Sequence, residues 1–176
     1  MLRFLVIERL AHLFVPRETA ARVVRQFAIE AKQDAAKFIE AEHMLLTLAA
    51  SEESDAFRLL NELGLTYRQI ASALHDERRR TLAFAGVEPF DEKQTAATEL
   101  DSPLTLGTSA KVAIKRALIA SHDGRPHRPR IQSCDLLFGI LQAELGTVPR
   151  TLAIAGIDRA ALLARTRKTQ MDRPRC

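Results

Sequence analysis

Aromatic residues are scarce in this 176-residue sequence, which has no tryptophan, one tyrosine and eight phenylalanines, or 5% aromatic residues in all. Glycine and proline are also few, with seven of each, although hydrophobic residues reach 47%. Sandwiches and barrels depend on β-branched and aromatic strands joined by frequent turns, so this composition argues against an all-β fold. Alanine and leucine dominate the apolar residues instead, and both favour helices. The chain is long enough for one core, or for two small units that share one.

Cysteine is equally scarce, with Cys134 and Cys176 as the two in the sequence and no Cys-x-x-Cys pair. The five histidines and two cysteines never fall into metal-ligand spacing. We therefore expect no disulfide framework and no structural metal, and free thiols in a reducing cytoplasm. None of the glycines opens a Gly-x4-Gly-Lys-Ser/Thr phosphate loop, so the sequence has no means of cradling ATP phosphates. No cofactor is expected.

An uninterrupted apolar run of the roughly 20 residues that a membrane span needs is also missing. The apolar N-terminus, MLRFLVIERLAHLFV, is broken by Glu8, Arg9 and His12, and no small-residue cleavage site follows it. A signal peptide would lack these interruptions and would have such a site. We expect residues 1–16 to form an extension helix packed on the body. A strand, or a helix that lies on a membrane surface, is the alternative.

Positive charge is unevenly spread along the chain, whose net charge is +4. Residues 1–100 carry 13 Lys and Arg against 16 Asp and Glu, whereas residues 101–176 carry 13 against 6. A basic second half permits acidic partners, nucleic acid included, although many proteins with such a surface bind neither.

Helical periodicity runs through most of the chain and occurs twice. The first copy predicts helices over about 18–33, 41–50 and 54–63, and a fourth from Thr66 towards Arg80. In the second copy, TSAKVAIKRALIA follows the first helix by 90 residues. CDLLFGILQ matches EHMLLTLAA, and RTLAIAGIDRAALLA matches RLLNELGLTYRQIAS, both at a spacing of 92. The duplication predicts an all-α, pseudo-twofold array of about eight helices.

The turns before the last helix of each copy correspond residue by residue. Gly64 pairs with Gly156, and glycine readily takes the positive φ that ends a helix. Thr66 forms a capping box with Gln69, and Asp158 replaces Thr66 as the cap in the second copy.

The duplication also sets the domain boundaries. We expect one domain over residues 17–168, with repeat one at 17–83, a linker at 84–106 and repeat two at 107–168. The linker contains two prolines, a glycine and several acidic residues that break the periodicity. Residues 169–176 are predicted to be a basic, disordered tail.

The stretch GLTYRQIASAL, residues 64–74, is similar to part of a helix-turn-helix and precedes Arg78, Arg79 and Arg80. Its counterpart, GIDRAALLART, keeps the glycine, the cap and the apolar spacing but loses the polar pattern that DNA contact would require. A helix-turn-helix also needs a second helix after a turn of about three or four residues, and here the helix runs on. We interpret the stretch as a structural repeat.

Taken together, the duplicated segments resemble the N-terminal (Clp repeat) domain of Hsp100/Clp unfoldases of the ClpA and ClpC kind. The resemblance covers roughly residues 17–168, and its most specific element is the Glu-His pair that opens the second helix. The segments that carry it are ARVVRQFAIEA (21–31), IEAEHMLLTLA (39–49), LLNELGL (59–65), SAKVAIKRAL (109–118), CDLLFGIL (134–141) and AIAGI (153–157). Because no phosphate loop is present, the resemblance implies a free-standing Clp N-domain without its ATP-driven motor.

In that family the domain binds adaptors or substrates, and in some members the glutamate of each Glu-His motif holds the guanidinium of a phosphorylated arginine. The resemblance carries this ligand role to Glu42 alone, with His43 as its orienting partner. In the second copy, Cys134 and Asp135 stand at the corresponding positions. The family's Thr-Pro-Arg triplet reads Gly107-Thr108-Ser109 here. The alternative for Glu42 and His43 is that both cap the short helix.

Two further features carry alternatives. The loop HDGRPHRPR, residues 122–130, contributes Arg125, Arg128 and Arg130, which would dock an acidic surface or a phosphate unless the loop is simply solvated. Cys134 lies beside Asp135, with His122 and His127 nearby in sequence, and is a candidate nucleophile for a small hydrolase; an ordinary packed thiol is the alternative.

The sequence therefore predicts a non-enzymatic, cytoplasmic protein-binding module that recruits or regulates substrates or adaptors for Clp-type ATP-dependent proteolysis. Its expected partners are Clp unfoldase or protease components, adaptors and client proteins, and no membrane. The partner-binding candidates are Glu42, His43, Arg125, Arg128 and Arg130. The alternative is a basic protein that binds nucleic acid non-specifically through its C-terminal half, with steep salt dependence.

Overall fold

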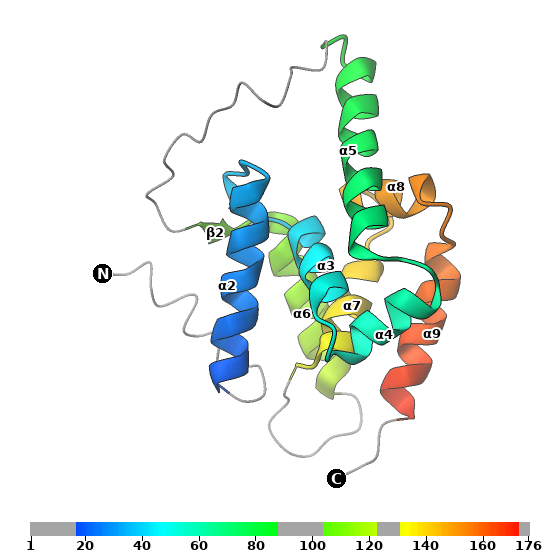
Figure 1. The fold of residues 1–176 in the computed structure, drawn as a ribbon. Coiled ribbons are helices and arrows are strands. Elements are labelled where there is room, and N and C mark those ends of the chain that lie inside the picture. Colours follow the sequence, from blue (N-terminus) through cyan, green and yellow to red (C-terminus); the bar gives the residue numbers. More distant parts are fainter. Residues whose placement is uncertain (1–16, 88–103, 123–130, 173–176) are drawn as a thin grey trace.

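The computed structural model describes residues 17–87, 104–122 and 131–172, with side chains from Val23 onwards. Eight helices and two short strands lie within these ranges, and the all-α prediction is confirmed (Figure 1). Repeat one contains α2 (Arg17–Gln33), β1 (Phe38–Ile39), α3 (Ala41–Ala50), α4 (Asp55–Glu62) and α5 (Tyr67–Phe84). Then follow β2 (Thr105–Leu106), α6 (Thr108–His122), α7 (Ser133–Leu141), α8 (Thr147–Ile154) and α9 (Arg159–Met171). The predicted extension, residues 1–16, lies outside the described residues.

Two short helices, α3 and α7, occupy the centre of the array and contact each other (Figure 1). Both are apolar around almost their whole circumference, and their side chains make up much of the single core. A helix that is hydrophobic all round is one that other helices surround, so these two segments are the centres of the two repeats. The amphipathic helices α2, α4, α5, α6, α8 and α9 pack around them.

The largest helix–helix contact joins α6 to α7, and it depends on Gly139. A Cβ atom at this position would lie 2.2 Å from the carbonyl oxygen of Ala113 and 2.9 Å from the backbone nitrogen of Ala117. The two helix backbones therefore approach more closely than any side chain at residue 139 would allow. The alanines on the facing side of α6 are fully or almost fully buried.

The paired turns end their helices in the same way, as the repeat alignment predicts. Gly64 has φ +74° and Gly156 has φ +73°. Leu65 N donates to Leu60 O at 2.9 Å, and the equivalent bond from Ile157 N to Leu152 O is also 2.9 Å. This six-to-one bond across a left-handed glycine is the Schellman arrangement, which needs glycine because other residues are strained at such φ values.

The predicted helix starts are also present. Thr66 N donates to the Gln69 side chain at 2.9 Å, and Gln69 N donates to the Thr66 hydroxyl at 3.4 Å, which completes the capping box. Asp158 accepts hydrogen bonds from Ala160 N and Ala161 N at the start of α9. Each cap satisfies amides that have no partner within their own helix.

A short parallel ladder joins the two repeats, and helical periodicity did not predict it. Phe38 and Ile39 of β1 pair with Thr105 and Leu106 of β2, and the ladder continues with Gly107 N donating to Ile39 O at 2.8 Å. The strands place the start of α3 beside the start of α6.

A second connection between the repeats is polar. Glu77 on α5 is buried, and its carboxylate accepts hydrogen bonds from Arg150 Nε at 2.6 Å and from the Thr81 hydroxyl at 2.9 Å. Arg150 belongs to α8, which packs against α5.

The ends of two helices extend beyond the expected segment boundaries. The helix α5 runs to Phe84, and its last turns project from the body, so that the Phe84 side chain is 96% exposed (Figure 1). The helix α9 continues to Met171, within the segment predicted as a tail. Among the described residues, no helix combines the length and apolar character needed to cross a bilayer.

Candidate partner-binding site

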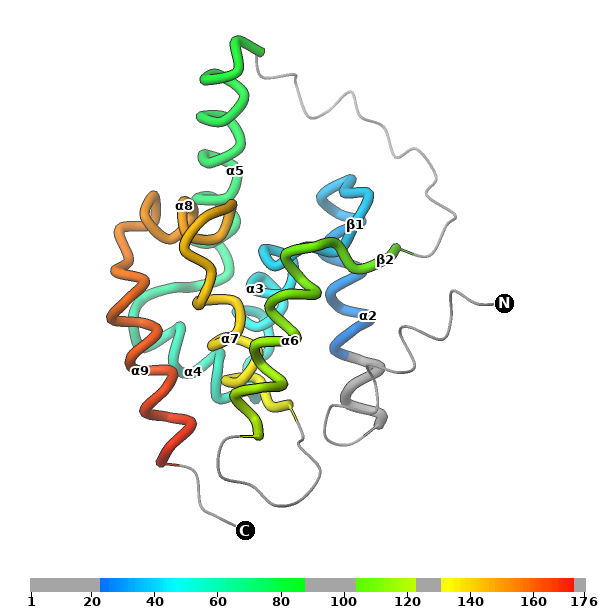
Figure 2. Tube along the Cα trace, turned by 180° about the vertical axis from the view of Figure 1, so that it is seen from behind, coloured from blue at the N-terminus to red at the C-terminus, as the bar shows by residue number. Residues whose placement is uncertain are grey.

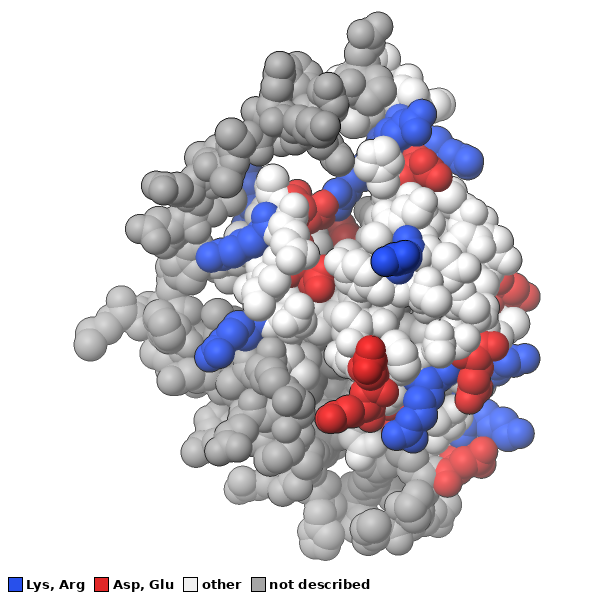
Figure 3. Space-filling view, viewed as in Figure 1, with Lys and Arg blue, Asp and Glu red and all other residues white. Residues whose placement is uncertain are grey.

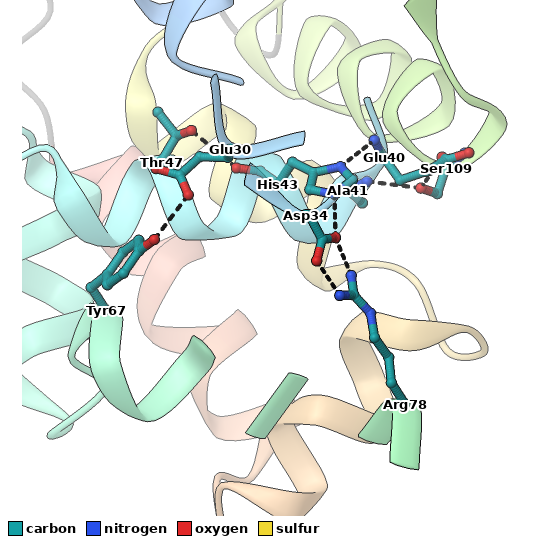
Figure 4. Close-up of polar contacts among 9 residues, drawn as sticks. All are labelled: Glu30, Asp34, Glu40, Ala41, His43, Thr47, Tyr67, Arg78 and Ser109. Atoms are coloured by element: carbon teal, nitrogen blue, oxygen red, sulfur yellow. Dashed lines mark hydrogen bonds and ion pairs between the residues drawn. The ribbon is translucent and has the colours of Figure 1, made fainter. Parts of the chain in front are cut away.

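The start of α3 carries both residues of the Glu-His pair, and it lies where the two repeats meet. Glu40 is the N-cap residue, Glu42 stands in the first turn, and His43 follows one position later. Carboxylates are favoured here because the first amides of a helix carry partial positive charge. Across the junction, Ala41 N donates to the Ser109 hydroxyl at 2.8 Å (Figure 4).

The Glu40 carboxylate is bound by the start of α6. Its Oε2 atom accepts hydrogen bonds from Ser109 N at 3.0 Å and from the Ser109 hydroxyl at 2.5 Å. A Cβ atom at Gly107 would lie 1.8 Å from Glu40 Oε1, so only glycine leaves room for this carboxylate. Gly107-Thr108-Ser109 stands where the family has Thr-Pro-Arg. The glycine leaves space for Glu40, whose carboxylate caps the start of α6 from within the protein.

His43 is buried, with 1% of its surface exposed, and both ring nitrogens are used within the protein. Nδ1 accepts a hydrogen bond from Glu40 N at 2.9 Å, so the proton of the neutral ring is on Nε2, which lies 2.9 Å from Asp34 Oδ2. Asp34 in turn forms a bidentate ion pair with Arg78 of α5 (Figure 4). His43 therefore supports the start of α3 from within, as the capping alternative describes, and its role in partner binding stays a prediction.

Asp34 and Glu42 are neighbouring carboxylates whose pKa values shift in opposite directions. Burial raises the pKa of Asp34, but hydrogen bonds from His43 and Arg78, together with the charge of Arg78, outweigh it and leave the pKa below the usual value. Burial likewise raises the pKa of Glu42, and the charge of Glu40 adds to this effect. The bond to its own amide and the electrostatic interactions with His43 and Arg78 only partly offset the rise. Among the described residues, no other side chain donates a hydrogen bond to Glu42.

A second buried carboxylate, Glu30, faces the same region from α2. It accepts a hydrogen bond from the Tyr67 hydroxyl at 3.0 Å (Figure 4). It also accepts one from Gln26 Nε2 at 3.4 Å. Partial burial and the bond to Glu30 raise the pKa of Tyr67. Tyr67 belongs to the stretch that is similar to a helix-turn-helix, and here its hydroxyl links the start of α5 to α2.

The second repeat has the same arrangement with different chemistry. Asp135 occupies the position of His43, and its Oδ2 atom accepts a hydrogen bond from Gln132 N at 2.8 Å. Gln170 Nε2 donates to Asp135 Oδ1 at 2.8 Å. Gln170 lies 92 residues after Arg78, as Asp135 does after His43. In repeat two, Asp135 alone accepts the bond from the N-cap amide and binds Gln170. In repeat one, His43 accepts the bond from the N-cap amide, and Asp34 binds Arg78.

Cys134, at the position of Glu42, is fully buried in the core. A thiol with no exposed surface cannot reach a substrate, which argues against the hydrolase alternative. The described ranges hold no cluster of three or more His, Cys, Asp or Glu side chains that could bind a metal ion. Arg125, Arg128 and Arg130 lie outside the described residues.

A groove of about 470 Å³ opens beside the start of α3. It lies between α6, the end of α7 and the residues that lead to α8. Ala41 forms one end, and Gly139 lies in the lining. The remaining lining residues are Ser109, Val112, Ala113, Arg116, Ile140, Gln142, Ala143, Glu144 and Leu145. The groove therefore lies on repeat two, at the place where that repeat meets Ala41 of repeat one.

Solved structures match this chain, and one of them matches almost all of it. The N-terminal domain of the caseinolytic protease associated chaperone ClpD from Arabidopsis thaliana superimposes with a TM-score of 0.63 at 20% sequence identity. The match covers 92% of this chain and 96% of that one. The fold is that of a Clp N-terminal domain. No protein-family model matches the sequence, and no curated protein matches it.

Within this Clp N-terminal fold, the sequence indicates Glu42 and His43 but not the residues that hold His43. Asp34 begins the turn after α2, and the sequence alone suggests Arg78 only as a DNA contact. The spacing of 92 between Arg78 and Gln170 is an available signal, because Gln170 binds the capping side chain of repeat two directly and Arg78 reaches that of repeat one through Asp34. Asp34 has no equivalent in repeat two, so a comparison of the two repeats does not indicate its role.

The two carboxylates should give opposite dependences of stability on pH. Asp34 has a folded-state pKa below its usual 3.8, so its contribution is present above pH 3.8 and is lost as the pH falls through the folded value. Glu42 has a folded-state pKa above its usual 4.5, so its contribution is present below pH 4.5 and is lost as the pH rises through the folded value. At neutral pH, Glu42→Gln should therefore raise the melting temperature, and Asp34→Asn should lower it.

Urea unfolding of both variants and the parent between about pH 3 and pH 7 measures this difference. The Asp34→Asn variant should also lose part of the acid sensitivity of the parent below pH 3.8. A lower stability of Glu42→Gln at neutral pH would contradict the described environment of Glu42.

Proposed function

We propose that this chain is a non-enzymatic, cytoplasmic protein-binding module that recruits or regulates substrates or adaptors for a Clp-type proteolytic system. The observation that carries the proposal is the Clp N-terminal fold, shared over 92% of the chain with a domain of a chaperone described as associated with caseinolytic protease. The groove at the junction of the repeats supports it, since peptide segments commonly bind in grooves between helices.

Glu42 is the residue that we place at the centre of partner binding. Its carboxylate is held in a half-buried position that disfavours its charge, and no other described side chain hydrogen-bonds to it. A charged group kept at a cost to stability is typical of a functional position. A positively charged group of a partner would stabilise the charged form of Glu42 in place of the water that burial excludes. An arginine or lysine side chain is therefore the ligand that fits.

A phosphorylated arginine fits less well. Glu42 could take the guanidinium, but the phosphate would gain nothing from the start of α6, where Ser109 N and the Ser109 hydroxyl already bind Glu40. We therefore propose an unmodified cationic side chain as the ligand of Glu42. Free phosphoarginine is a useful competitor in the experiment below.

The nucleic-acid alternative has less support. Asp34 binds Arg78, and Arg79 lies 3.9 Å from Asp76, so this part of the predicted basic surface is partly neutralised. On the described part of the face in Figure 3, Lys and Arg alternate with Asp and Glu and form no continuous basic surface. A nucleic-acid groove would need such a surface along the phosphate backbone.

A pull-down from lysate of the source cell tests the proposal. The tagged chain and its Glu42→Gln variant are compared after nuclease treatment in about 0.3 M salt, which screens ordinary surface charge. We expect the parent to recover Clp unfoldase, protease or discrete client proteins, and Glu42→Gln to recover at least fivefold less. Because Glu42→Gln should be at least as stable as the parent, a loss of binding cannot be ascribed to unfolding.

Four other outcomes would count against the proposal. Equal recovery by both variants would remove Glu42 from the site. Absence of Clp components and of discrete clients would remove the recruitment function. Recovery of nucleic acid alone, in a parallel sample without nuclease at low salt, would favour the alternative. Loss of binding in the presence of free phosphoarginine would indicate that a phosphorylated arginine is the ligand of Glu42.

A further inference from the structure

The outward face of α6 carries an apolar strip with cations on both sides. Val112 is 41% exposed and Ile119 is 59% exposed, and their separation of seven residues places them on one line along the helix. At about 100° per residue, Lys111 and Lys115 fall on one side of this line and Arg116 falls on the other. In the view of Figure 2, α6 runs along the near side of the body.

The strip borders the groove at the junction of the repeats. Val112 and Arg116 belong to both, and across the groove Leu145 stands 91% exposed. The exposed side chains of Val112 and Leu145 therefore both line the groove, and Gly139 and Ile140 also belong to its lining. Glu144 is the acidic residue of the lining and Arg116 is the basic one. Large apolar side chains gathered around a depression mark an interaction site more often than singly scattered ones do.

The positive charge of the α6 surface indicates which kind of partner it can bind. The helix α6 contains three cations and no Asp or Glu, and within the described residues Lys111, Lys115 and Arg116 take part in no ion pair. Uncompensated cations beside apolar side chains complement a partner that offers carboxylates around an apolar anchor. The face also presents no aromatic side chain on which a nucleotide base could stack, which single-stranded nucleic-acid sites require.

We propose that this surface, the α6 face, binds an acidic segment of a partner protein whose apolar side chains recur at helical spacing. The apolar side chains lie along Val112, Ile119 and Leu145, and the carboxylates face the lysines and Arg116. This inference rests on the proposed protein-binding function and names the chemistry of one partner surface. It is separate from Glu42, which takes a cation.

Binding of designed fluorescent peptides tests the α6 face. The first peptide is an amphipathic helix with leucines at i, i+3, i+4 and i+7 and glutamates elsewhere. The second replaces the glutamates with lysines, and the third replaces the leucines with alanines. By fluorescence anisotropy in about 0.1 M salt, we expect the first to bind at least tenfold more tightly than either of the others. A basic peptide that bound equally well would overturn the proposal.

Substitutions with matched controls locate the site. Val112→Glu and the double variant Lys111→Glu/Lys115→Glu should each weaken binding of the first peptide at least tenfold. Leu82→Glu is the control for Val112→Glu, because Leu82 is 39% exposed on α5. Arg79→Glu/Arg80→Glu is the control for the lysine pair. All six positions are exposed, so circular dichroism should show an unchanged fold.

The outcomes separate this inference from the proposed function. If the pull-down recovers Clp components but Val112→Glu leaves peptide binding unchanged, the α6 face is wrong and the proposed function stands. If peptide binding falls as much in the Arg79/Arg80 variant as in the lysine variant, the acidic peptide is attracted by the positive charge of the whole protein and not by the α6 face. The proposal would then be wrong. Tighter binding of a single-stranded oligonucleotide than of the first peptide would also contradict it.

Discussion

Gly139→Ala should destabilise the protein by about 3 kcal/mol or more, a large part of the 5–15 kcal/mol of a typical domain. The added Cβ atom would lie 2.2 Å from Ala113 O and 2.9 Å from Ala117 N. Both atoms belong to the backbone of α6, so no side chain can rotate to make room. The α6–α7 contact, the largest in the fold, would have to open.

Urea unfolding of Gly139→Ala and of Gly64→Ala measures the effect against a suitable control. Gly64 has a positive φ, but no atom lies within 4 Å of an added Cβ, so its substitution brings backbone strain without a clash. We expect this control to lose about 1 kcal/mol. Equal losses in the two variants would mean that α6 and α7 do not pack as closely as described.

His43→Asp should cost about 3 kcal/mol at neutral pH, although aspartate is the residue that repeat two uses at this position. The new carboxylate could still accept the hydrogen bond from Glu40 N, as Asp135 accepts that from Gln132 N. It would, however, face Asp34, whose Oδ2 atom lies 2.9 Å from the histidine ring nitrogen. The aspartate side chain is shorter than that of histidine, but its carboxylate would still lie near the half-buried Asp34, and neighbouring carboxylates repel each other or take up a proton.

The double variant His43→Asp/Asp34→Asn tests the cause. The amide of residue 34 would donate to the new carboxylate, in the way that Gln170 donates to Asp135. We expect the second substitution to recover about 1 kcal/mol of the loss, although Asp34→Asn alone is destabilising. A double variant whose loss equals the sum of the two single losses would show that His43 contributes only packing.

The helices and their ends were predictable because their causes are local. The Thr66–Gln69 box, the Asp158 cap and the glycine ends at Gly64 and Gly156 each depend on residues within one turn of chain. Apolar spacing then distinguishes the central helices α3 and α7 from the amphipathic helices around them. The internal duplication added a second observation of each element, which made weak signals persuasive and pointed to the Clp N-terminal fold.

The candidate site was predictable only in part. Glu42 and His43 were identified because they are adjacent in a recognisable motif. Their surroundings were not, because Asp34 and Arg78 come from a turn and a helix that only folding brings together. Arg78 illustrates the limit, since a cluster of arginines in sequence indicates a basic surface until the structure places a carboxylate against one of them.

By itself, the sequence determined which segments are helical, where they begin and end, and that the unit occurs twice, because capping, glycine conformation and apolar periodicity act over a few residues. Only the tertiary structure decided that Gly139 marks a backbone contact, that Glu40 caps α6 and that the other described residues leave the α6 face uncovered. Each of these depends on residues far apart in the chain, such as Glu40 and Ser109, whose approach no local pattern encodes. Tertiary packing brings such residues together, whereas the helix propensity of each segment does not.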